Sequence, residues 1–272
     1  MTSQRSGNGD LESRVAHLER QLALAESYSI EAFWTALDAA YEAILPRRQL
    51  GCIVCDHAGE RGAFEVLTDR CMFGGGRLER YRCPKCDCIF GPQKYLDLDE
   101  AFVSRDYQLL YTRYSESDST QNEIRTFRSL RPAAGGLYLD WGCGGAWSRT
   151  VAALRGDGWD VWGFEPSAKA TGDFVVNRRE AISARFDGIF SNNVIEHFRN
   201  PIAQFKDFHS LLADGGWMAH SSPCYEYAYA FTRFHTLFLL GRSPHVLAER
   251  TGFRVQERTQ DGEYINVVFA RI

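Results

Sequence analysis

The chain has 272 residues, of which 44% are hydrophobic, 13% aromatic and 24% charged. This is the composition of a folded globular protein, and it excludes global disorder and collagen-like repeats. The formal net charge of −4 gives no bulk positive field that would attract nucleic acid or an anionic membrane. No apolar run reaches the roughly 18 residues of a membrane span. The sequence therefore predicts neither a membrane segment nor a nucleic-acid partner.

The first fifty residues predict a disordered tail followed by a long helix. Residues 1–10 are small and polar, whereas residues 11–45 contain neither proline nor glycine. Steps of four and three separate Leu11, Val15, Leu18, Leu22 and Ala25. This spacing is that of a coiled-coil seam about two heptads long, which would make the protein a homo-oligomer. A single amphipathic helix packed on its own protein explains the same pattern, so both interpretations stay open.

Two Cys-x-x-Cys turns predict a zinc-binding module in residues 51–97. The turns are formed by Cys52 and Cys55, and by Cys83 and Cys86. Each turn can place two thiolates about 2.3 Å from one tetrahedral ion, so four cysteines would close a structural Zn²⁺ site. His57 and Cys88 are near enough in sequence to replace a ligand, which leaves the fourth ligand open. Two redox-active or merely buried cysteine pairs are the alternative.

After this module the pattern is first helical and then alternating. Residues 98–134 carry tyrosines at helical spacing and are interpreted as a helical linker or lid. Residues 135–272 alternate short apolar runs with helical segments, which predicts an α/β fold with a parallel sheet. One short strand runs into the glycine-rich segment WGCGG, and the next strand ends at Glu165. An acid at the tip of the second strand is placed to accept hydrogen bonds from both hydroxyls of a ribose.

These segments resemble the class I S-adenosylmethionine-dependent methyltransferases. The matching motifs are LDWGCGG (139–145), VWGFEPS (161–167), FDGIFSNNVIEHF (186–198), LLADGGW (211–217) and TGFRV (251–255). The resemblance covers residues 135–272 and implies a Rossmann-like seven-stranded sheet whose sixth and seventh strands form an antiparallel hairpin. The cysteine module ahead of it resembles a zinc-ribbon-like module in a bacterial subgroup that often acts in sugar or natural-product pathways.

The resemblance also implies which residues bind the cofactor, S-adenosylmethionine. Asp140 and the amides of Gly142 and Gly144 would line its methionine end, Glu165 would hold the ribose, and Asn192 and Asn193 would border the methyl donor. The stretch from Glu165 to Asp187 is short for a helix, a third strand and their connections. The family's adenine contacts usually lie in that stretch, and none is assigned here.

Two histidines are candidates for a general base that activates the methyl acceptor. His197 directly follows the expected fourth strand, and groups at the carboxyl ends of strands face the substrate in open α/β sheets. His235 lies in an aromatic stretch, residues 223–240, where a substrate lid would lie. Either histidine could instead be structural. The motif Asn193-x-x-Glu196-His197 is also similar to a metal site of some methyltransferases, with Asn193 replacing a carboxylate.

The sequence thus predicts a methyltransferase that uses S-adenosylmethionine and carries a structural zinc module. The acceptor suggested by the resemblance is a hydroxyl of a sugar, a glycan end or a related small metabolite. A non-catalytic cofactor-binding or scaffold protein on the same fold is one alternative, and an RNA-modifying methyltransferase is another, although the acidic balance disfavours it. Eight cysteines are too few for a disulfide scaffold, and the polar start lacks a hydrophobic signal core, so we expect a cytoplasmic protein.

Overall fold

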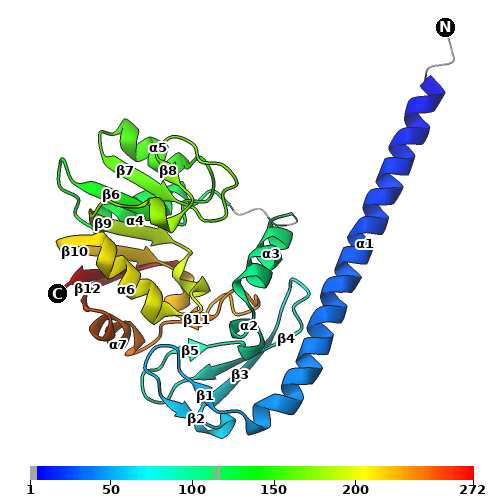
Figure 1. Cartoon of the computed structure of the whole chain (residues 1–272), viewed down its shortest axis with the longest axis horizontal. Helices are drawn as coiled ribbons and strands as arrows, with labels where there is room; N and C mark the ends of the chain where they lie inside the picture. Colours follow the sequence, from blue (N-terminus) through cyan, green and yellow to red (C-terminus); the bar gives the residue numbers. More distant parts are fainter. Residues whose placement is uncertain (1–4, 113, 115–116) are drawn as a thin grey trace.

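The structure is a computed structural model that describes residues 5–112, 114 and 117–272. A long helix, α1 (Arg5–Ile44), runs along one side of the molecule and projects beyond it (Figure 1). The helix begins inside the stretch of residues 1–10 that was expected to be a disordered tail. Extending an existing helix costs far less than nucleating one, so residues 5–10 can continue the helix that follows. Pro46 lies in the 3-10 turn η1 (Leu45–Arg47) at the other end.

A small β module follows α1. Its elements are β1 (Leu50–Gly51), β2 (Ala58–Gly59), the 3-10 turn η2 (Arg61–Ala63), β3 (Glu65–Arg70), β4 (Arg77–Arg82) and β5 (Ile89–Phe90). Strands β3 and β4 form an antiparallel hairpin that is closed by the pair Arg70 and Arg77. The later strand β11 (Leu237–Phe238) pairs with β5, so the sheet order is β11-β5-β4-β3. The module therefore shares a sheet with a segment from far along the chain.

Three helices connect the module to the main sheet. They are α2 (Gln93–Leu96), α3 (Glu100–Tyr111) and α4 (Thr120–Ser129). The side chain of Asp99 caps α3 by accepting a hydrogen bond from the amide of Phe102, at 2.7 Å. Trp34 of α1 is 1% exposed and packs near Tyr95 and Phe102, which docks the second half of α1 on the body.

The main sheet has seven strands in the order β12-β13-β10-β9-β6-β7-β8. Their bounds are β6 (Leu137–Trp141), β7 (Asp160–Phe164), β8 (Val175–Val176), β9 (Phe186–Asn192), β10 (Leu212–Ser221), β12 (Phe253–Asp261) and β13 (Tyr264–Arg271). Strands β8, β7, β6, β9 and β10 are parallel, whereas β13 is antiparallel to both β10 and β12. The expected seven-stranded methyltransferase sheet with its terminal hairpin is confirmed.

Helices cover both faces of this sheet. Helix α4 lies against β9 and β10, and α5 (Arg149–Gly156) lies against β7 (Figure 1). Helices α6 (Pro201–Leu211) and α7 (Ser243–Arg250) pack against each other, and α7 also packs against β12. The 3-10 turns η3 (Arg179–Ala181), η4 (Ile195–His197) and η5 (Pro223–Tyr225) lie between the other elements. The largest buried apolar cluster joins Tyr81 and Phe90 of the β module to Ile189 and Phe205 of the main domain. No helix in the described part of the chain is long and apolar enough to cross a membrane.

The third strand of the sheet, β8, has only two residues. Residues 165–185, all of which the structure describes, contain β8 and the turn η3 but no α-helix. Backbone bonds replace the missing helix: the amide of Gly163 donates to the carbonyl of Phe174 at 2.8 Å, and that of Gly172 to Ala146 at 2.9 Å. The short stretch anticipated from the sequence is therefore accommodated by omitting the helix before β8.

Candidate functional site

The four cysteines of the β module form one cluster. Their Sγ atoms all lie within 4.8 Å of one another, with Cys52 and Cys86 3.6 Å apart and Cys55 and Cys83 3.5 Å apart. The two turns have matching geometry, because Asp56 and Asp87, which each follow the second cysteine of a pair, have positive φ angles of 58° and 68°. The structure thus brings together the four cysteines that the sequence predicted as metal ligands.

This cluster fits a tetrahedral Zn²⁺ ion. Four bonds of about 2.3 Å place neighbouring sulfurs about 3.8 Å apart, which is close to the two separations found. Burial raises the pKa of Cys83 to about 11, and the hydrogen bond with Cys52 raises that of Cys86 further above its usual range. Hydrogen bonds with Cys86 and Cys88 lower the pKa of Cys52 instead, so the cluster favours one thiolate, and a cation would compensate the further negative charges if Cys83 and Cys86 also lost their protons. His57 and Cys88 do not belong to the cluster, and four sulfurs leave no open coordination position.

Asp140 and the glycine loop lie at the carboxyl end of β6. Asp140 is 1% exposed, and its Oδ2 accepts no hydrogen bond from any described residue. Burial, followed by the charges of Glu123 and Glu165, raises the pKa of Asp140 well above its usual range. A cationic group, such as the ammonium of an amino acid, would relieve this buried carboxyl. These features fit the methionine end of S-adenosylmethionine.

The glycines of the loop allow close approach of the backbone. Gly142 has a φ of +80°, and a Cβ there would lie 2.7 Å from Cγ2 of Val194, in the loop after β9. Gly144 has a φ of +83° and faces open space. Both conformations are unfavourable for other residues, and the second position leaves room for a ligand against the main chain.

Glu165, at the tip of β7, is 9% exposed and partly saturated with hydrogen bonds. Its Oε2 accepts the amide of Gly144 at 3.1 Å, while its Oε1 accepts both the amide of Ser167 at 3.0 Å and its hydroxyl at 2.6 Å. A carboxylate has about four acceptor positions. A ribose with two hydroxyls would therefore need the Ser167 hydroxyl to turn away from Glu165.

Asn192 and Asn193 lie at the same edge of the sheet. Asn192 ends β9 and accepts a hydrogen bond at 2.6 Å from the hydroxyl of Ser221, the last residue of β10. Asn193 has a φ of 55°, and its backbone N–H donates a hydrogen bond to the backbone carbonyl of Ser221 at 2.9 Å. Because β6, β7, β9 and β10 run parallel, all six residues proposed to bind the cofactor lie at or just beyond the carboxyl edge.

The two candidate histidines, distant in sequence, meet in space. The rings of His197 and His235 have centroids 5.1 Å apart, and the ring of Tyr107 from α3 lies 5.6 Å from that of His197. Nδ1 of His197 lies 3.0 Å from the carbonyl of Phe234. A carbonyl can only accept, so Nδ1 carries the proton of the neutral ring and Nε2 can accept a proton.

A carboxylate completes this histidine cluster. Glu196 is 1% exposed and accepts a hydrogen bond from the Ser222 hydroxyl at 2.9 Å, and its carboxylate lies within 4.8 Å of nitrogens of both histidines. Burial, then the charges of His197 and Arg80, lower the pKa of His235 well below its usual range, so this ring is neutral near pH 7. The cluster therefore places two imidazole rings, one of them held neutral, beside a buried carboxyl group.

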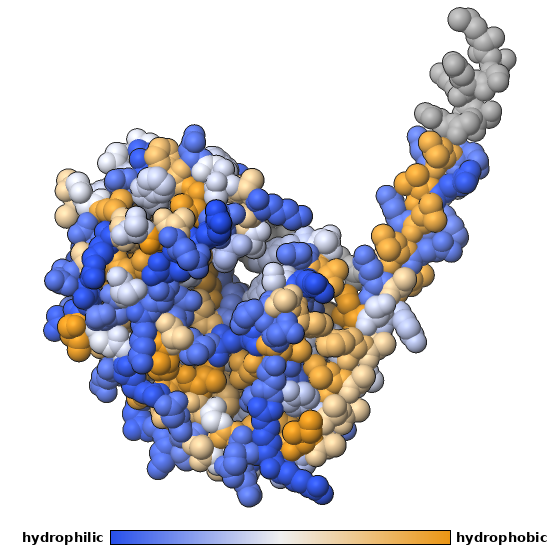
Figure 2. All heavy atoms as spheres, viewed as in Figure 1, coloured by the Kyte–Doolittle hydropathy of each residue, from blue (hydrophilic) through white to orange (hydrophobic). Residues whose placement is uncertain are grey.

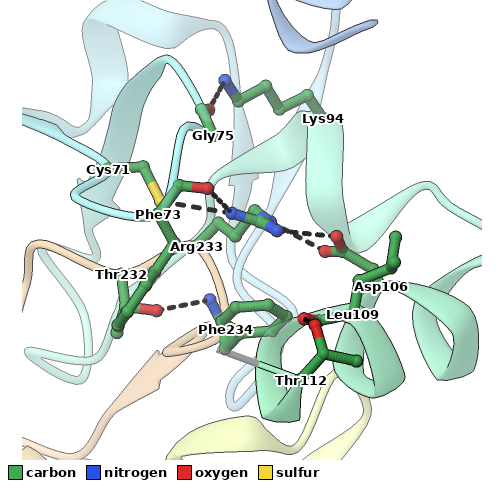
Figure 3. A network of polar contacts seen from close by, with 10 residues as sticks. All are labelled: Cys71, Phe73, Gly75, Lys94, Asp106, Leu109, Thr112, Thr232, Arg233 and Phe234. Atoms are coloured by element: carbon green, nitrogen blue, oxygen red, sulfur yellow. Dashed lines mark hydrogen bonds and ion pairs between the residues drawn. The ribbon is translucent and has the colours of Figure 1, made fainter. Parts of the chain in front are cut away.

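Arg80 of β4 holds the segment that carries His235, and we did not identify this residue from the sequence. Arg80 is fully buried and donates to the carbonyls of Ala230 at 2.7 Å, Thr232 at 2.6 Å and His235 at 3.0 Å. On the other side of the segment, Arg233 forms a buried ion pair with Asp106 at 2.6 Å and donates to the carbonyl of Phe73 at 2.9 Å (Figure 3). The alternation of Leu78, Arg80 and Arg82 is the sequence signal that would place Arg80 on the same face of the strand as Leu78.

The fold and this strand-edge site define a class I methyltransferase architecture, and comparison with known proteins identifies the family. A family model described as a methyltransferase domain matches residues 113–262, more than half of the chain. The chain belongs to this methyltransferase family and is an enzyme of the S-adenosylmethionine-dependent class. A search of curated proteins finds no significant match.

Several solved methyltransferase structures are similar to this chain at low identity. A 1,6-didemethyltoxoflavin N1-methyltransferase from Burkholderia thailandensis is 14% identical, with a TM-score of 0.48, and the match covers 71% of this chain and 95% of that one. A TehB-like methyltransferase from Corynebacterium glutamicum is 21% identical, with a TM-score of 0.40 and coverages of 64% and 97%. A possible histamine N-methyltransferase from Thermotoga maritima is 17% identical, with a TM-score of 0.43 and coverages of 64% and 98%.

Proposed function

We propose that this protein methylates a hydroxyl of a sugar, a glycan end or a related small metabolite, with His197 as the general base. The single observation that supports the choice of base is the meeting of His197, His235 and Glu196 beyond the carboxyl edge of the parallel strands. The acceptor class is the one that the family resemblance of the sequence suggests. A hydroxyl is a weak nucleophile and loses its proton as it is methylated, so a base within hydrogen-bond reach accelerates the transfer.

In this proposal each of the site residues has a separate role in cofactor binding or proton transfer. S-adenosylmethionine supplies a methyl group bonded to a positively charged sulfur. Asp140 would hold the methionine end and Glu165 the ribose, which fixes the reactive methyl group at the strand edge. Nε2 of His197 would take the acceptor's proton, and the Glu196 carboxylate would stabilise the resulting imidazolium. His235, held neutral by burial, would add a hydrogen-bonding wall without a competing positive charge.

Turnover by variants of the two histidines tests this assignment. His197→Asn should lower kcat about 100- to 10,000-fold, while S-adenosylmethionine affinity stays within about twofold. The matched variant His235→Asn should lower kcat less. If His197→Asn keeps the kcat of the parent, His197 is not the base. If the parent binds no S-adenosylmethionine in a calorimetric titration, the protein is instead a scaffold on this fold.

The acceptor class is tested with panels of small molecules and RNA. Activity on nucleotide-linked sugars, glycan ends or related hydroxyl compounds supports the proposal, whereas turnover only on RNA would establish the alternative.

We also propose the cytoplasm as the working compartment. All eight cysteines are free thiols, which persist in a reducing environment and remain available to a metal. Localisation of a tagged protein to another compartment would contradict this proposal.

A further inference from the structure

The projecting half of α1 presents an apolar seam that no described part of the chain covers. Leu11, Val15, Leu18 and Leu22 are 58%, 45%, 62% and 61% exposed. Figure 2 shows hydrophobic side chains following one line along this part of the helix. In the docked half, by contrast, Trp34 is 1% exposed. Burying a leucine side chain is worth roughly 1.5–3 kcal/mol, so a continuous exposed seam favours association with another surface.

The seam points away from the face that docks on the body. At about 100° per residue, Leu18 points roughly 160° from Trp34 around the helix axis. The protein's own body therefore occupies a different side of α1 from the seam. A second helix can approach the seam without displacing the contacts that hold α1 in place.

The seam's composition fits a two-stranded coiled coil. The spacing of four and three assigns Leu11, Leu18 and Ala25 to d positions of a heptad, and Val15 and Leu22 to a positions. A β-branched residue at a combined with leucine at d favours two parallel strands. Val15 between Leu11 and Leu18 has that arrangement.

The charges beside the seam select the orientation and the partner. Arg14 occupies a g position, while Glu12, Glu19 and Glu26 occupy e positions. In a parallel pair each g residue faces the e residue five positions later in the other helix, so Arg14 of one copy faces Glu19 of the other. An antiparallel pair of the same helices would set the glutamates at e positions against one another, which is unfavourable.

We propose that residues 11–25 of α1 pair with the same residues of a second copy of this chain as a parallel, two-stranded coiled coil. Two heptads alone are too short for a stable coiled coil, but each helix is already anchored by its docked half, which reduces the cost of ordering. A parallel pair also brings the two catalytic bodies to the same end of the coiled coil.

Light scattering over a range of concentrations tests the pairing on the full-length protein. The parent should approach twice the monomer mass, and Leu18→Asp should raise the dissociation constant at least tenfold. Leu24→Asp is the matched control, because Leu24 is 72% exposed but lies outside the seam, and it should leave the mass unchanged. Circular dichroism and S-adenosylmethionine binding check that each variant remains folded. A parent that stays monomeric, or a Leu18→Asp variant that stays dimeric, overturns the proposal.

Charge exchange tests the orientation. Arg14→Glu alone and Glu19→Arg alone should each weaken the dimer several-fold, because each places like charges opposite each other. The double variant R14E/E19R should restore the parent's dissociation constant, since it recreates the pair with reversed signs. If the double variant is no tighter than either single variant, the parallel arrangement is wrong. Loss of self-association together with capture of a different protein would assign the seam to that partner instead.

Discussion

At the scale of residues, the strand edge holds carboxyl groups in contrasting environments. Asp140 is buried with an oxygen that no described residue satisfies, whereas Glu165 accepts three hydrogen bonds. The sequence alone does not predict this difference in hydrogen bonding, because Asp140 and Glu165 are both acidic residues at the ends of neighbouring strands. The contrast suits the two acids to different ligand groups. Asp140 can bind a cationic group, and Glu165 can exchange an internal donor for ligand hydroxyls.

The Glu165 assignment predicts a loss of cofactor affinity. Glu165→Gln removes charge-assisted hydrogen bonds to the ribose and should weaken S-adenosylmethionine binding by about 1.5–3 kcal/mol, roughly ten- to a hundredfold. Ser167→Ala is the matched control, because it removes a competing donor and should leave affinity equal or higher. Calorimetric titration measures both, and unchanged affinity in Glu165→Gln would show that the ribose is held elsewhere.

His220 predicts how stability depends on pH. Burial lowers the pKa of His220 from 6.5 to about 3, whereas the unfolded chain retains the ordinary value. The unfolded state therefore binds more protons between these two values, and stability falls as the pH drops below about 6.5. While His220 stays neutral, this one group should contribute a slope of about 1.4 kcal/mol per pH unit.

Denaturant unfolding between pH 4 and 6 measures this slope. His220→Phe, which places a ring among Phe205, Phe208 and Phe269, should reduce the pH slope of the unfolding free energy by about 1.4 kcal/mol per unit. Equal slopes in the parent and His220→Phe would mean that His220 is protonated in the folded protein.

At the scale of elements, the module proposed to bind zinc has one hairpin of six-residue strands, β3 and β4, and otherwise only very short strands. Strands β1, β2 and β5 have two residues each. One cysteine turn lies between β1 and β2, and the other lies between β4 and β5. Such elements cannot bury enough surface to fold alone, so a metal is expected to supply part of the stability. Because β5 pairs with β11, which directly follows His235 in the chain, a folded module also holds the segment around His235 in place.

The zinc assignment predicts about one zinc per chain in purified protein. Cys83→Ser should lose the metal and lower the melting temperature, whereas Cys71→Ser, outside the four-cysteine cluster, should keep the metal. Elemental analysis and thermal melts measure these outcomes. Metal-free protein with a normal melt contradicts the assignment. A second metal ion per chain that is lost in His235→Asn would instead place a metal at Glu196, His197 and His235.

At the scale of the whole molecule, parts far apart in sequence build the histidine cluster together. Arg80 comes from the β module, Tyr107 and Asp106 from α3, and His197 from the turn after β9. The largest apolar cluster also spans the module and the main domain. The module therefore supports the site, even though a metal held by its four cysteines would have no open position for chemistry.

Arg80 is predicted to be a positioning residue. Arg80→Lys keeps a positive charge but cannot reach the three carbonyls together, so the 230–235 segment should shift and kcat should fall about ten- to a hundredfold. Affinity for S-adenosylmethionine should stay within about twofold, because the cofactor residues lie on other loops. Arg82→Lys, on the same strand with a half-exposed side chain, is the control. A parallel loss of kcat and cofactor affinity would indicate general unfolding instead.

Spacing along the chain was enough to predict the features that depend on a few neighbouring residues. Alternating apolar runs predicted the parallel α/β sheet, and the family resemblance added its seven strands. Two Cys-x-x-Cys turns predicted that four cysteines would come together, as they do. The cofactor site at the glycine loop and Glu165 stays a prediction. The geometry of each pattern follows from backbone periodicity. Packing between distant segments, which only the folded structure reveals, placed His197 beside His235 and Arg80 beneath residues 230–235, and it raised the pKa of Asp140. Burial and proximity across the chain set these properties, and spacing along the chain encodes neither.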